Sequence, residues 1–359
     1  MKLKCAIIGC GRMGARPNKL VEDASPSFWR PLSHIDAITT NDKLQLNSIC
    51  DVDQSRLEDI AYEYHVENVF TSYRDLLEIG GIDLLTVATR TIDRAKILID
   101  AYNAGIKAIH IEKPLCNSVA ELKSLSHIFR DEDVYITLGA IRRYLPPYKL
   151  AKELINQGAI GELRQIQVNY GYSNLYWSHP HSVDMLLYFA ECDDIQYVQS
   201  KMANVEYNSN GEISNDPLVE WGVIGFENGI TGLITSSPGW DVVLSGSMGK
   251  IVIEANGSKI VSYLMRGNSP YYKPEELHLD NSDGNNGGTY LPIDELRKCF
   301  CKERDAISRN IRDKKDIYLG QAVLFALLKS SENNSSKETI SDALNTEITI
   351  LGATDGKFA

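Results

Sequence analysis

The first stretch of this 359-residue sequence that could carry chemistry is Gly9-Cys-Gly11-Arg-Met-Gly14, directly after a short apolar run. Glycines at this spacing allow a tight turn and the close approach of a pyrophosphate, whose charge the N-terminus of the following helix stabilises. We therefore expect Gly9, Gly11 and Gly14, with Arg12 and Met13 between them, to bind a dinucleotide. An ordinary strand-to-helix turn is the alternative interpretation.

Asp51 follows the next apolar run, Leu44–Cys50. An acidic side chain at that strand end binds ribose hydroxyls and repels a 2′-phosphate, so the sequence favours NAD and leaves NADP open. A helix N-cap is the alternative role. Asp51 comes 37 residues after Gly14, whereas about 20 is usual. We interpret residues 15–33, which contain three prolines, as an inserted loop, either a lid over the cofactor or an interface.

A charged pair, Glu112-Lys113, precedes Pro114 and follows another apolar run. The carboxyl ends of parallel strands face the crevice in which ligands bind. A lysine there can hydrogen-bond a substrate hydroxyl, and its charge stabilises a developing alkoxide. A solvated surface pair explains the same residues equally well.

His181 and Asp184 begin an apolar helix and share one of its faces. A carboxylate beside an imidazole orients it and supports its cationic form, as a general base requires. A helix cap is the alternative. We expect no metal site, because His179-Pro-His181 lacks further ligands and Cys299-Phe-Cys301 lacks a second pair.

The composition excludes several classes of protein. The formal net charge is −11 and the pI is near 5.2. Binding to nucleic acids or to anionic membranes requires a basic surface, so the charge disfavours both. No apolar run approaches the ~18 residues of a membrane span, and the N-terminus lacks the features of a signal peptide. The seven cysteines form no disulfide framework, which indicates a reducing cytoplasm.

Apolar runs and amphipathic stretches alternate in the first 144 residues, which indicates βαβ units and a parallel sheet, hence an α/β fold. The expected strands lie at 4–9, 44–50, 82–88, 108–112 and 134–138, and the expected helices at about 33–40, 56–64, 93–104 and 119–129.

The pattern changes after about residue 145, so we expect a second α/β domain over 145–359. Alternating runs separated by short Gly/Asn turns indicate a mainly antiparallel sheet. The expected strands are 163–170, 195–207, 218–226, 230–236, 242–245, 250–254 and 259–264. A helix at 148–157, a polar loop at 281–288, and helices at about 292–312 and 319–331 complete the expected second domain.

Together these features resemble the glucose-fructose oxidoreductase, inositol dehydrogenase and MocA (Gfo/Idh/MocA) family over nearly the whole chain. The residues that carry the resemblance are the glycine motif, Asp51, Glu112-Lys113-Pro114, Gly139-Ala-Ile-Arg-Arg143-Tyr144, Gly158-Ala-Ile-Gly161 and His181-x-x-Asp184. The lysine-containing tripeptide at this distance from the glycine motif is the specific element.

The resemblance implies a doubly wound N-terminal Rossmann domain and a C-terminal domain with an open sheet, through which the protein forms a homodimer or homotetramer. It implies hydride transfer between NAD(P) and a hydroxyl or keto group of a sugar or sugar derivative, phosphorylated and nucleotide-linked ones included. Lys113 would contact the reacting hydroxyl, His181 would move the proton, and Asp184 would position substrate or imidazole. The other implied cofactor contacts are Ala88, Thr89 and Glu112, and the other implied substrate contacts are Arg143, Tyr144, Asn174 and Trp177.

The sequence departs from the family pattern at the substrate site. Trp177 stands where an Asp is usual, and Ile141 where an Asn often precedes the arginine pair. An inositol-like substrate is therefore doubtful. Two other activities stay open: a cofactor-binding regulator without catalysis, and a reductase of an imine or unsaturated substrate.

Overall fold

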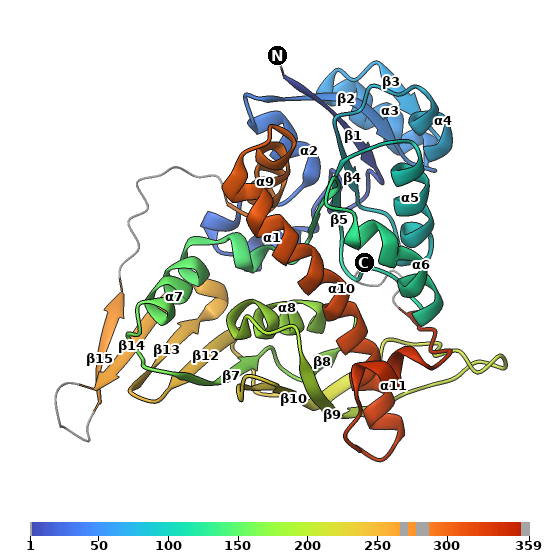
Figure 1. The fold of residues 1–359 in the computed structure, drawn as a ribbon. Coiled ribbons are helices and arrows are strands. Elements are labelled where there is room, and N and C mark those ends of the chain that lie inside the picture. The colour runs from blue at the N-terminus through green and yellow to red at the C-terminus, as the bar shows by residue number, and fades with distance from the viewer. Residues whose placement is uncertain (1, 266–271, 278–286, 353–359) are drawn as a thin grey trace.

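The computed structural model describes residues 2–265, 272–277 and 287–352. Two sheets dominate it, and the long helix α10 runs from one to the other (Figure 1). The first sheet has six strands and the second has nine. This arrangement confirms the predicted α/β fold with one parallel and one mainly antiparallel sheet.

The first sheet is parallel throughout, in the order β3-β2-β1-β4-β5-β6. Strands β4, β5 and β6 are buried at every position, which explains their continuous apolar runs. The strands are β1 (Leu3–Ile8), β2 (Leu44–Cys50), β3 (Asn68–Phe70), β4 (Leu84–Val87), β5 (Ala108–Ile111) and β6 (Tyr135–Leu138). The accompanying helices are α2 (His34–Thr40), α3 (Gln54–Tyr64), α4 (Tyr73–Glu78), α5 (Thr91–Asn103) and α6 (Val119–Arg130).

The segment 15–33 is not a simple loop, contrary to the prediction. It contains a short helix, α1 (Lys19–Ala24), and a 3-10 turn over Ser27–Trp29. Asn18 caps α1 by accepting a hydrogen bond from the Leu20 N–H, a local signal that the prolines obscured. The end of the segment is hydrogen-bonded to the second half of the chain, since Gly287 N–H donates to the Arg30 carbonyl at 2.8 Å.

The second sheet has the order β15-β14-β13-β12-β7-β11-β10-β8, with β9 also paired to β10. Its pairs are antiparallel except β7 with β11. Its strands are β7 (Leu163–Asn169), β8 (Ser173–Asn174), β9 (Ile195–Ala203), β10 (Leu218–Phe226), β11 (Thr231–Thr235), β12 (Asp241–Gly246), β13 (Gly249–Glu254), β14 (Lys259–Met265) and β15 (Tyr272–Leu277). Helices α7 (Pro146–Asn156) and α8 (His179–Ala190) lie on the side of this sheet that faces the first sheet (Figure 1).

The C-terminal helices end at residues other than those predicted. Helix α9 spans Tyr290–Phe300, α10 is one continuous helix over Arg304–Glu332, and α11 spans Ile340–Leu344. The break between α9 and α10 falls at Lys302, whose φ is +63°. The predicted helix ends placed this break at 313–318, a stretch that includes Asp313 and Lys314. Both of those charged residues are buried inside α10 with partners. Most of the expected polar loop, 281–286, lies outside the described residues.

Helices α9 and α10 pack on strands of the first sheet although they follow the second in sequence. Asn310 of α10 accepts from the Ile136 N–H at 3.1 Å and donates to its carbonyl at 2.8 Å. The predicted domain boundary after residue 144 stays a prediction, because one apolar core cluster includes residues of both sheets.

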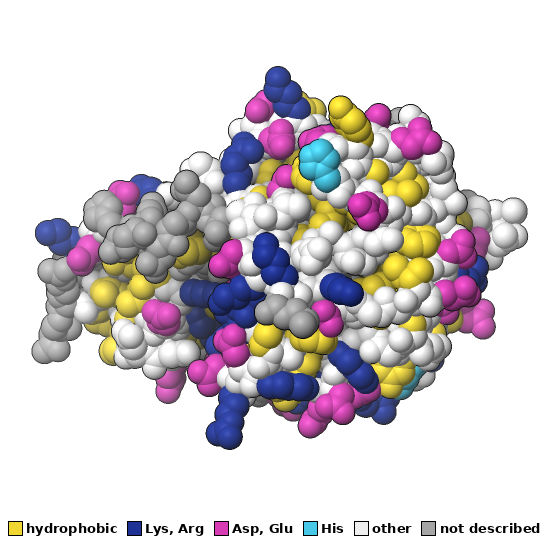
Figure 2. All heavy atoms as spheres, turned by 90° about the horizontal axis from the view of Figure 1, so that it is seen from above, with side chains coloured by type: hydrophobic (Ala, Val, Ile, Leu, Met, Phe, Trp, Pro, Cys, Tyr) yellow, Lys and Arg dark blue, Asp and Glu magenta, His cyan; other side chains and the backbone are white. Residues whose placement is uncertain are grey.

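On the face shown in Figure 2, acidic and basic side chains are interspersed. No helix in the described ranges is both long and apolar enough to cross a bilayer.

Candidate functional site

The glycine turn between β1 and the following segment has the geometry of a backbone cradle. Gly9 has φ +93°, which favours glycine. A Cβ on Gly14 would lie 1.9 Å from the Gly9 carbonyl oxygen, so the turn can close only with glycine there. A Cβ on Gly11 would meet nothing within 4 Å. The turn is therefore tight at its first and last glycine and open at Gly11, as a pyrophosphate site requires.

Asp51 fixes this turn from the end of β2. Its Oδ2 accepts from the Cys10 N–H at 2.7 Å, and its Oδ1 accepts from the Asp53 N–H at 3.0 Å. Arg56 donates to the same Oδ1 at 2.8 Å and remains partly exposed. The carboxylate thus lies beside the glycine turn as predicted, and its Oδ2, which accepts only one hydrogen bond, retains a lone pair for a further donor.

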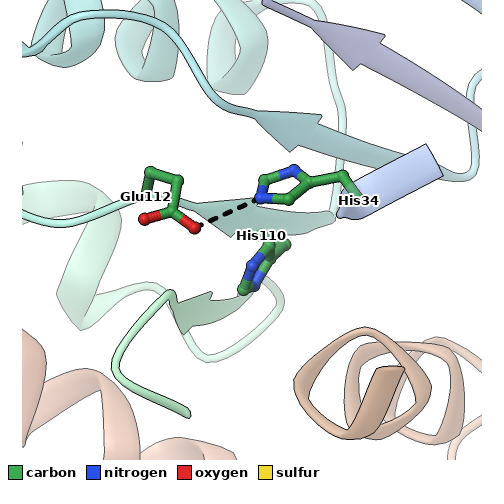
Figure 3. A group of neighbouring side chains, drawn as sticks. All are labelled: His34, His110 and Glu112. Carbon is green, nitrogen blue, oxygen red and sulfur yellow. Dashed lines mark hydrogen bonds and ion pairs between the residues drawn. The ribbon is translucent and has the colours of Figure 1, made fainter. Parts of the chain in front are cut away.

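Glu112 lies close to two histidines, His34 and His110, that are distant from each other in the sequence (Figure 3). His34 Nε2 is 3.3 Å from Glu112 Oε1, and the His34 and His110 rings lie 4.8 Å apart. Burial raises the pKa of Glu112, but the hydrogen bond and positive charge of His34 outweigh it and bring that pKa to about 2.

All three of these side chains are buried, and their ligand-type atoms lie within 4.8 Å of one another. Burial lowers the pKa of His110 to about 3, and the His34 charge contributes. Glu112 is therefore an internal anion that helps to fix the backbone before Lys113, since its Oε2 accepts from the Lys113 N–H at 3.2 Å. His34 comes from α2 after the inserted segment, so no spacing in the sequence reveals this contact.

Lys113 connects the end of β5 to the segment that precedes α8. Its ammonium donates to the Trp177 carbonyl at 2.8 Å and lies 4.1 Å from the centroid of the Trp177 ring. Loss of hydration lowers the pKa of Lys113 to about 8, although the charge of Glu112 opposes this shift. Asp216 accepts from the Trp177 N–H at 3.0 Å and so holds Trp177 in place.

His181 lies in the first turn of α8, close enough to Lys113 for its pKa to be affected. Burial lowers the pKa of His181 well below its usual value, and the charges of Arg142 and Lys113 lower it further. The imidazole is therefore neutral at neutral pH, and its Nδ1 has no partner among the described residues. A neutral imidazole with a free nitrogen can accept a proton.

Asp184 does not contact His181 through a hydrogen bond, contrary to what their spacing suggests. Its Oδ1 accepts from Arg143 Nε at 2.9 Å and Nη2 at 2.6 Å, and its buried Oδ2 has no partner among the described residues. Burial raises the pKa of Asp184 to about 6 against the opposing charge of Arg143. One carboxylate oxygen is thus held by Arg143 while the other stays free.

Arg143 and Tyr144, the predicted substrate contacts, lie in a buried polar cluster. Arg143 Nη1 also donates to Asp313 at 2.6 Å and to Asp316 at 3.0 Å, both on α10. The Tyr144 hydroxyl donates to Asp313 at 2.9 Å. These contacts occupy the Arg143 guanidinium and connect α8 to α10.

The remaining predicted contacts lie directly after β4 of the first sheet and in β8 of the second. The Ala88 N–H donates to the Ile8 carbonyl at 2.8 Å, which places residues 88 and 89 beside the glycine turn. A Cβ on Gly9 would meet the Ala88 carbonyl carbon at 2.7 Å. Asn174 donates to the Asp216 backbone carbonyl at 2.6 Å, so its amide supports the segment that carries Trp177.

Residues 3–140 match the model of a protein family described as an oxidoreductase family with an NAD-binding Rossmann fold (Gfo/Idh/MocA). Residues 3–140 are therefore similar to the NAD-binding Rossmann domain of that family. The match confirms the predicted resemblance, and the family's description names NAD as the bound dinucleotide. The closed turn at Gly9 and Gly14 and the open side at Gly11 fit that cofactor.

Curated relatives extend the likeness to different extents. A scyllo-inositol 2-dehydrogenase (NAD(+)) of Bacillus subtilis is 29% identical over 45% of this chain and 42% of its own length. The chain therefore spans less than half of that relative. A myo-inositol 2-dehydrogenase of Thermotoga maritima is 22% identical over 86% of this chain and 88% of its own. A levoglucosan dehydrogenase solved with NADH and levoglucosan has a similar fold, with TM-score 0.71 and 19% identity over 95% of this chain and 100% of that one.

Proposed function

We propose that this protein is a dehydrogenase that transfers a hydride between NAD(P) and a hydroxyl or keto group of a sugar or sugar derivative. The observation that carries the proposal is the contact between Lys113 and the Trp177 carbonyl. This contact brings the lysine at the end of β5 to the N-terminal side of α8, where His181 lies. We take these two separately predicted catalytic residues to act on the same substrate.

In the direction of oxidation, a nicotinamide cofactor held by the glycine turn and Asp51 would supply the acceptor for the hydride of the substrate carbon. His181 accepts the hydroxyl proton, because its imidazole is neutral and has a free Nδ1. The Lys113 ammonium stabilises the oxygen as it gains negative charge. In the direction of reduction, the same residues return the proton to the oxygen of the keto group.

Asp184 acts as a positioning residue rather than as the immediate partner of His181. Arg143 holds one of its oxygens, and the free Oδ2 is available to a substrate hydroxyl or to a reoriented imidazole. We assign Arg143 and Tyr144 the task of holding Asp184 against the interior of α10 at Asp313 and Asp316. Trp177 and Asn174 shape the substrate site from the segment that precedes α8.

We propose that NAD is preferred over NADP. The Asp51 carboxylate beside the glycine turn would repel a 2′-phosphate. Arg56 lies on that same carboxylate and is partly exposed, so it offers a nearby positive charge that a 2′-phosphate could use. Titration with NADH and NADPH, followed by cofactor fluorescence, tests the preference.

The test of the activity is the formation of NADH from NAD⁺ with a panel of free, oxidised, phosphorylated and nucleotide-linked sugars. The proposal predicts turnover of at least one member. Tight NADH binding without any turnover would favour a regulator that has lost catalysis. Turnover confined to imine or unsaturated substrates would favour the reductase.

We also propose that the protein forms a homodimer or homotetramer through the second sheet. Helices α7, α8 and α10 lie on one side of that sheet (Figure 1). Apolar side chains on the opposite side, such as Leu233, Val243 and Val252, are only half-buried in the single chain. Light scattering with size-exclusion chromatography measures the oligomeric state.

The seven free cysteines support the cytoplasm as the location.

A further inference from the structure

Two neighbouring arginines in the chain have opposite surroundings. Arg143 is enclosed by three carboxylates, as described above. Arg142 is equally buried, at 3% exposed, yet among the described residues its one hydrogen bond of ordinary geometry is to the Asn256 side-chain carbonyl, 2.7 Å from Nη2, and the Tyr148 hydroxyl interacts with it more weakly. Its Nε and Nη1 have no hydrogen-bond partner there.

Aromatic rings surround the Arg142 guanidinium. Its central carbon lies 4.8 Å from the Trp29 ring, 4.8 Å from the Tyr170 ring and 5.5 Å from the Trp240 ring. These rings come from the inserted segment, the end of β7 and the residue before β12. Such rings attract a cation, but they do not accept conventional hydrogen bonds from the N–H groups of the guanidinium. We call Arg142 with these three rings the arginine cage.

Other polar atoms at the arginine cage are also poorly satisfied. The buried hydroxyls of Tyr148 and Tyr170 lie close enough to Arg142 and to each other to affect one another's pKa. Neither completes a hydrogen bond of ordinary geometry among the described residues. Unpaired buried donors cost about 1–3 kcal/mol each, and a buried cation without a counter-charge is costlier still. The cage therefore lacks an anionic partner that would accept from several of these donors at once.

The arginine cage adjoins the catalytic residues. The positive charge of Arg142 contributes to the lowered pKa of His181 and of Lys113. Arg142 therefore interacts electrostatically with both groups. Arg142 and Lys113 place two positive charges around this region. The 3-10 turn that carries Arg142, Ile141–Tyr144, also packs against α8, the helix that carries His181.

We propose that Arg142 binds an anionic group of the substrate, so that the protein acts on acidic sugars that carry a carboxylate or a phosphate. The inference rests on the proposed dehydrogenase activity and deepens it by naming the substrate class. The guanidinium pairs with the anion, and the Tyr148 and Tyr170 hydroxyls can donate to the same oxygens. Trp29 closes the cage from the inserted segment, which gives that segment a role at the substrate site.

The test compares matched neutral and acidic sugars with the NADH-bound protein. The probes are glucose against glucuronate, galactose against galacturonate, and glucose against glucose 6-phosphate. Binding is followed by tryptophan fluorescence, since Trp29 and Trp240 flank Arg142. The variants are Arg142→Gln and Arg142→Lys, with Arg164→Gln on an exposed position of β7 as the control.

We expect the wild type and Arg164→Gln to bind at least one acidic member more tightly than its neutral partner. Arg142→Gln should lose about 30-fold or more of that affinity, as removal of one partner of a buried charge pair does, and should still bind NADH. Arg142→Lys should recover part of the preference. The carboxylate and phosphate probes distinguish the two anions.

Equal binding of neutral and acidic sugars by the wild type would overturn the proposal, as would a full acid preference in Arg142→Gln. A wild type that binds no acidic probe would also overturn it. NADH formation with the same sugars separates the two claims. Acid-selective binding without turnover contradicts the dehydrogenase, whereas turnover of neutral sugars without acid preference contradicts only the role of Arg142.

Discussion

At the scale of single residues, the cluster around Arg143 predicts a large loss of stability on substitution. Arg143→Met would leave the carboxylates of Asp184 and Asp313 buried without a cation and would leave Asp316 with Arg312 alone. We expect the free energy of unfolding to fall by about 3–5 kcal/mol. Chemical denaturation measures it. Arg16→Met, which removes an exposed ion pair with Glu63, is the control and should change stability by less than ~1 kcal/mol.

Lys113 gives the reaction a pH dependence. Its pKa of about 8 means that the ammonium is charged below that pH and neutral above it. Because the charged form stabilises the developing alkoxide, kcat/KM for oxidation should fall as the pH rises through about 8. The guanidinium that the variant Lys113→Arg carries instead would stay charged at all these pH values.

The comparison of the two pH profiles is the measurement. Whatever activity Lys113→Arg retains should lack the alkaline fall near pH 8. An identical fall in both proteins would assign it to another group. At acid pH both profiles should fall only well below the usual histidine pKa, since His181 stays neutral to lower pH.

The residue scale also shows where sequence reasoning ends. The glycines, Asp51 and Lys113 were proposed from their residue types and their places at strand ends, and His181 from its place at the start of an apolar helix. The partner of each arginine in the Arg142-Arg143 pair was not. Backbone geometry sends one side chain to the carboxylates of α10 and the other into the arginine cage, and no local pattern distinguishes them.

At the scale of elements, the glycine turn predicts different outcomes for two similar substitutions. Gly14→Ala would place a methyl group 1.9 Å from the Gly9 carbonyl oxygen and should destabilise the turn. Gly11→Ala meets no protein atom within 4 Å, so the protein should fold normally. Its methyl group would enter the space that a pyrophosphate needs, and NADH affinity should drop about tenfold or more.

Thermal unfolding and NADH titration of both variants check this prediction. Gly11→Ala should show an unchanged Tm with weakened NADH binding, whereas Gly14→Ala should lower both. Normal NADH affinity in Gly11→Ala would contradict the placement of the cofactor at this turn.

Helix α10 explains why some elements could not be predicted. The stretch at 313–316 is polar, which suggested a gap between two helices. In the fold Asp313 and Asp316 pair with Arg143, and Lys314 donates to the Val134 carbonyl at 2.7 Å. Long-range partners thus make a polar stretch suitable for a buried helix. Strand β3 is only three residues long, too short to show the alternation of apolar and polar residues by which a strand is predicted.

At the scale of the whole molecule, the two sheets depend on shared helices. Helices α9 and α10 cover β5 and β6, and Asn310 bonds both backbone groups of Ile136. A fragment of residues 1–144 would expose this apolar surface. We expect it to be poorly soluble or to unfold at a much lower temperature than the full chain, as measured by calorimetry. A fragment that folds and binds NADH like the full chain would contradict this dependence.

The central claim is that Lys113 acts on the reacting oxygen of a sugar beside bound NAD. The most direct test is the rate of NADH formation by Lys113→Met and wild type, at equal cofactor occupancy fixed by NADH titration. We expect the variant to bind NADH within about twofold of the wild type and to lose at least ~100-fold in kcat, as removal of an oxyanion-stabilising group does. Turnover by Lys113→Met at the wild-type rate would contradict the account.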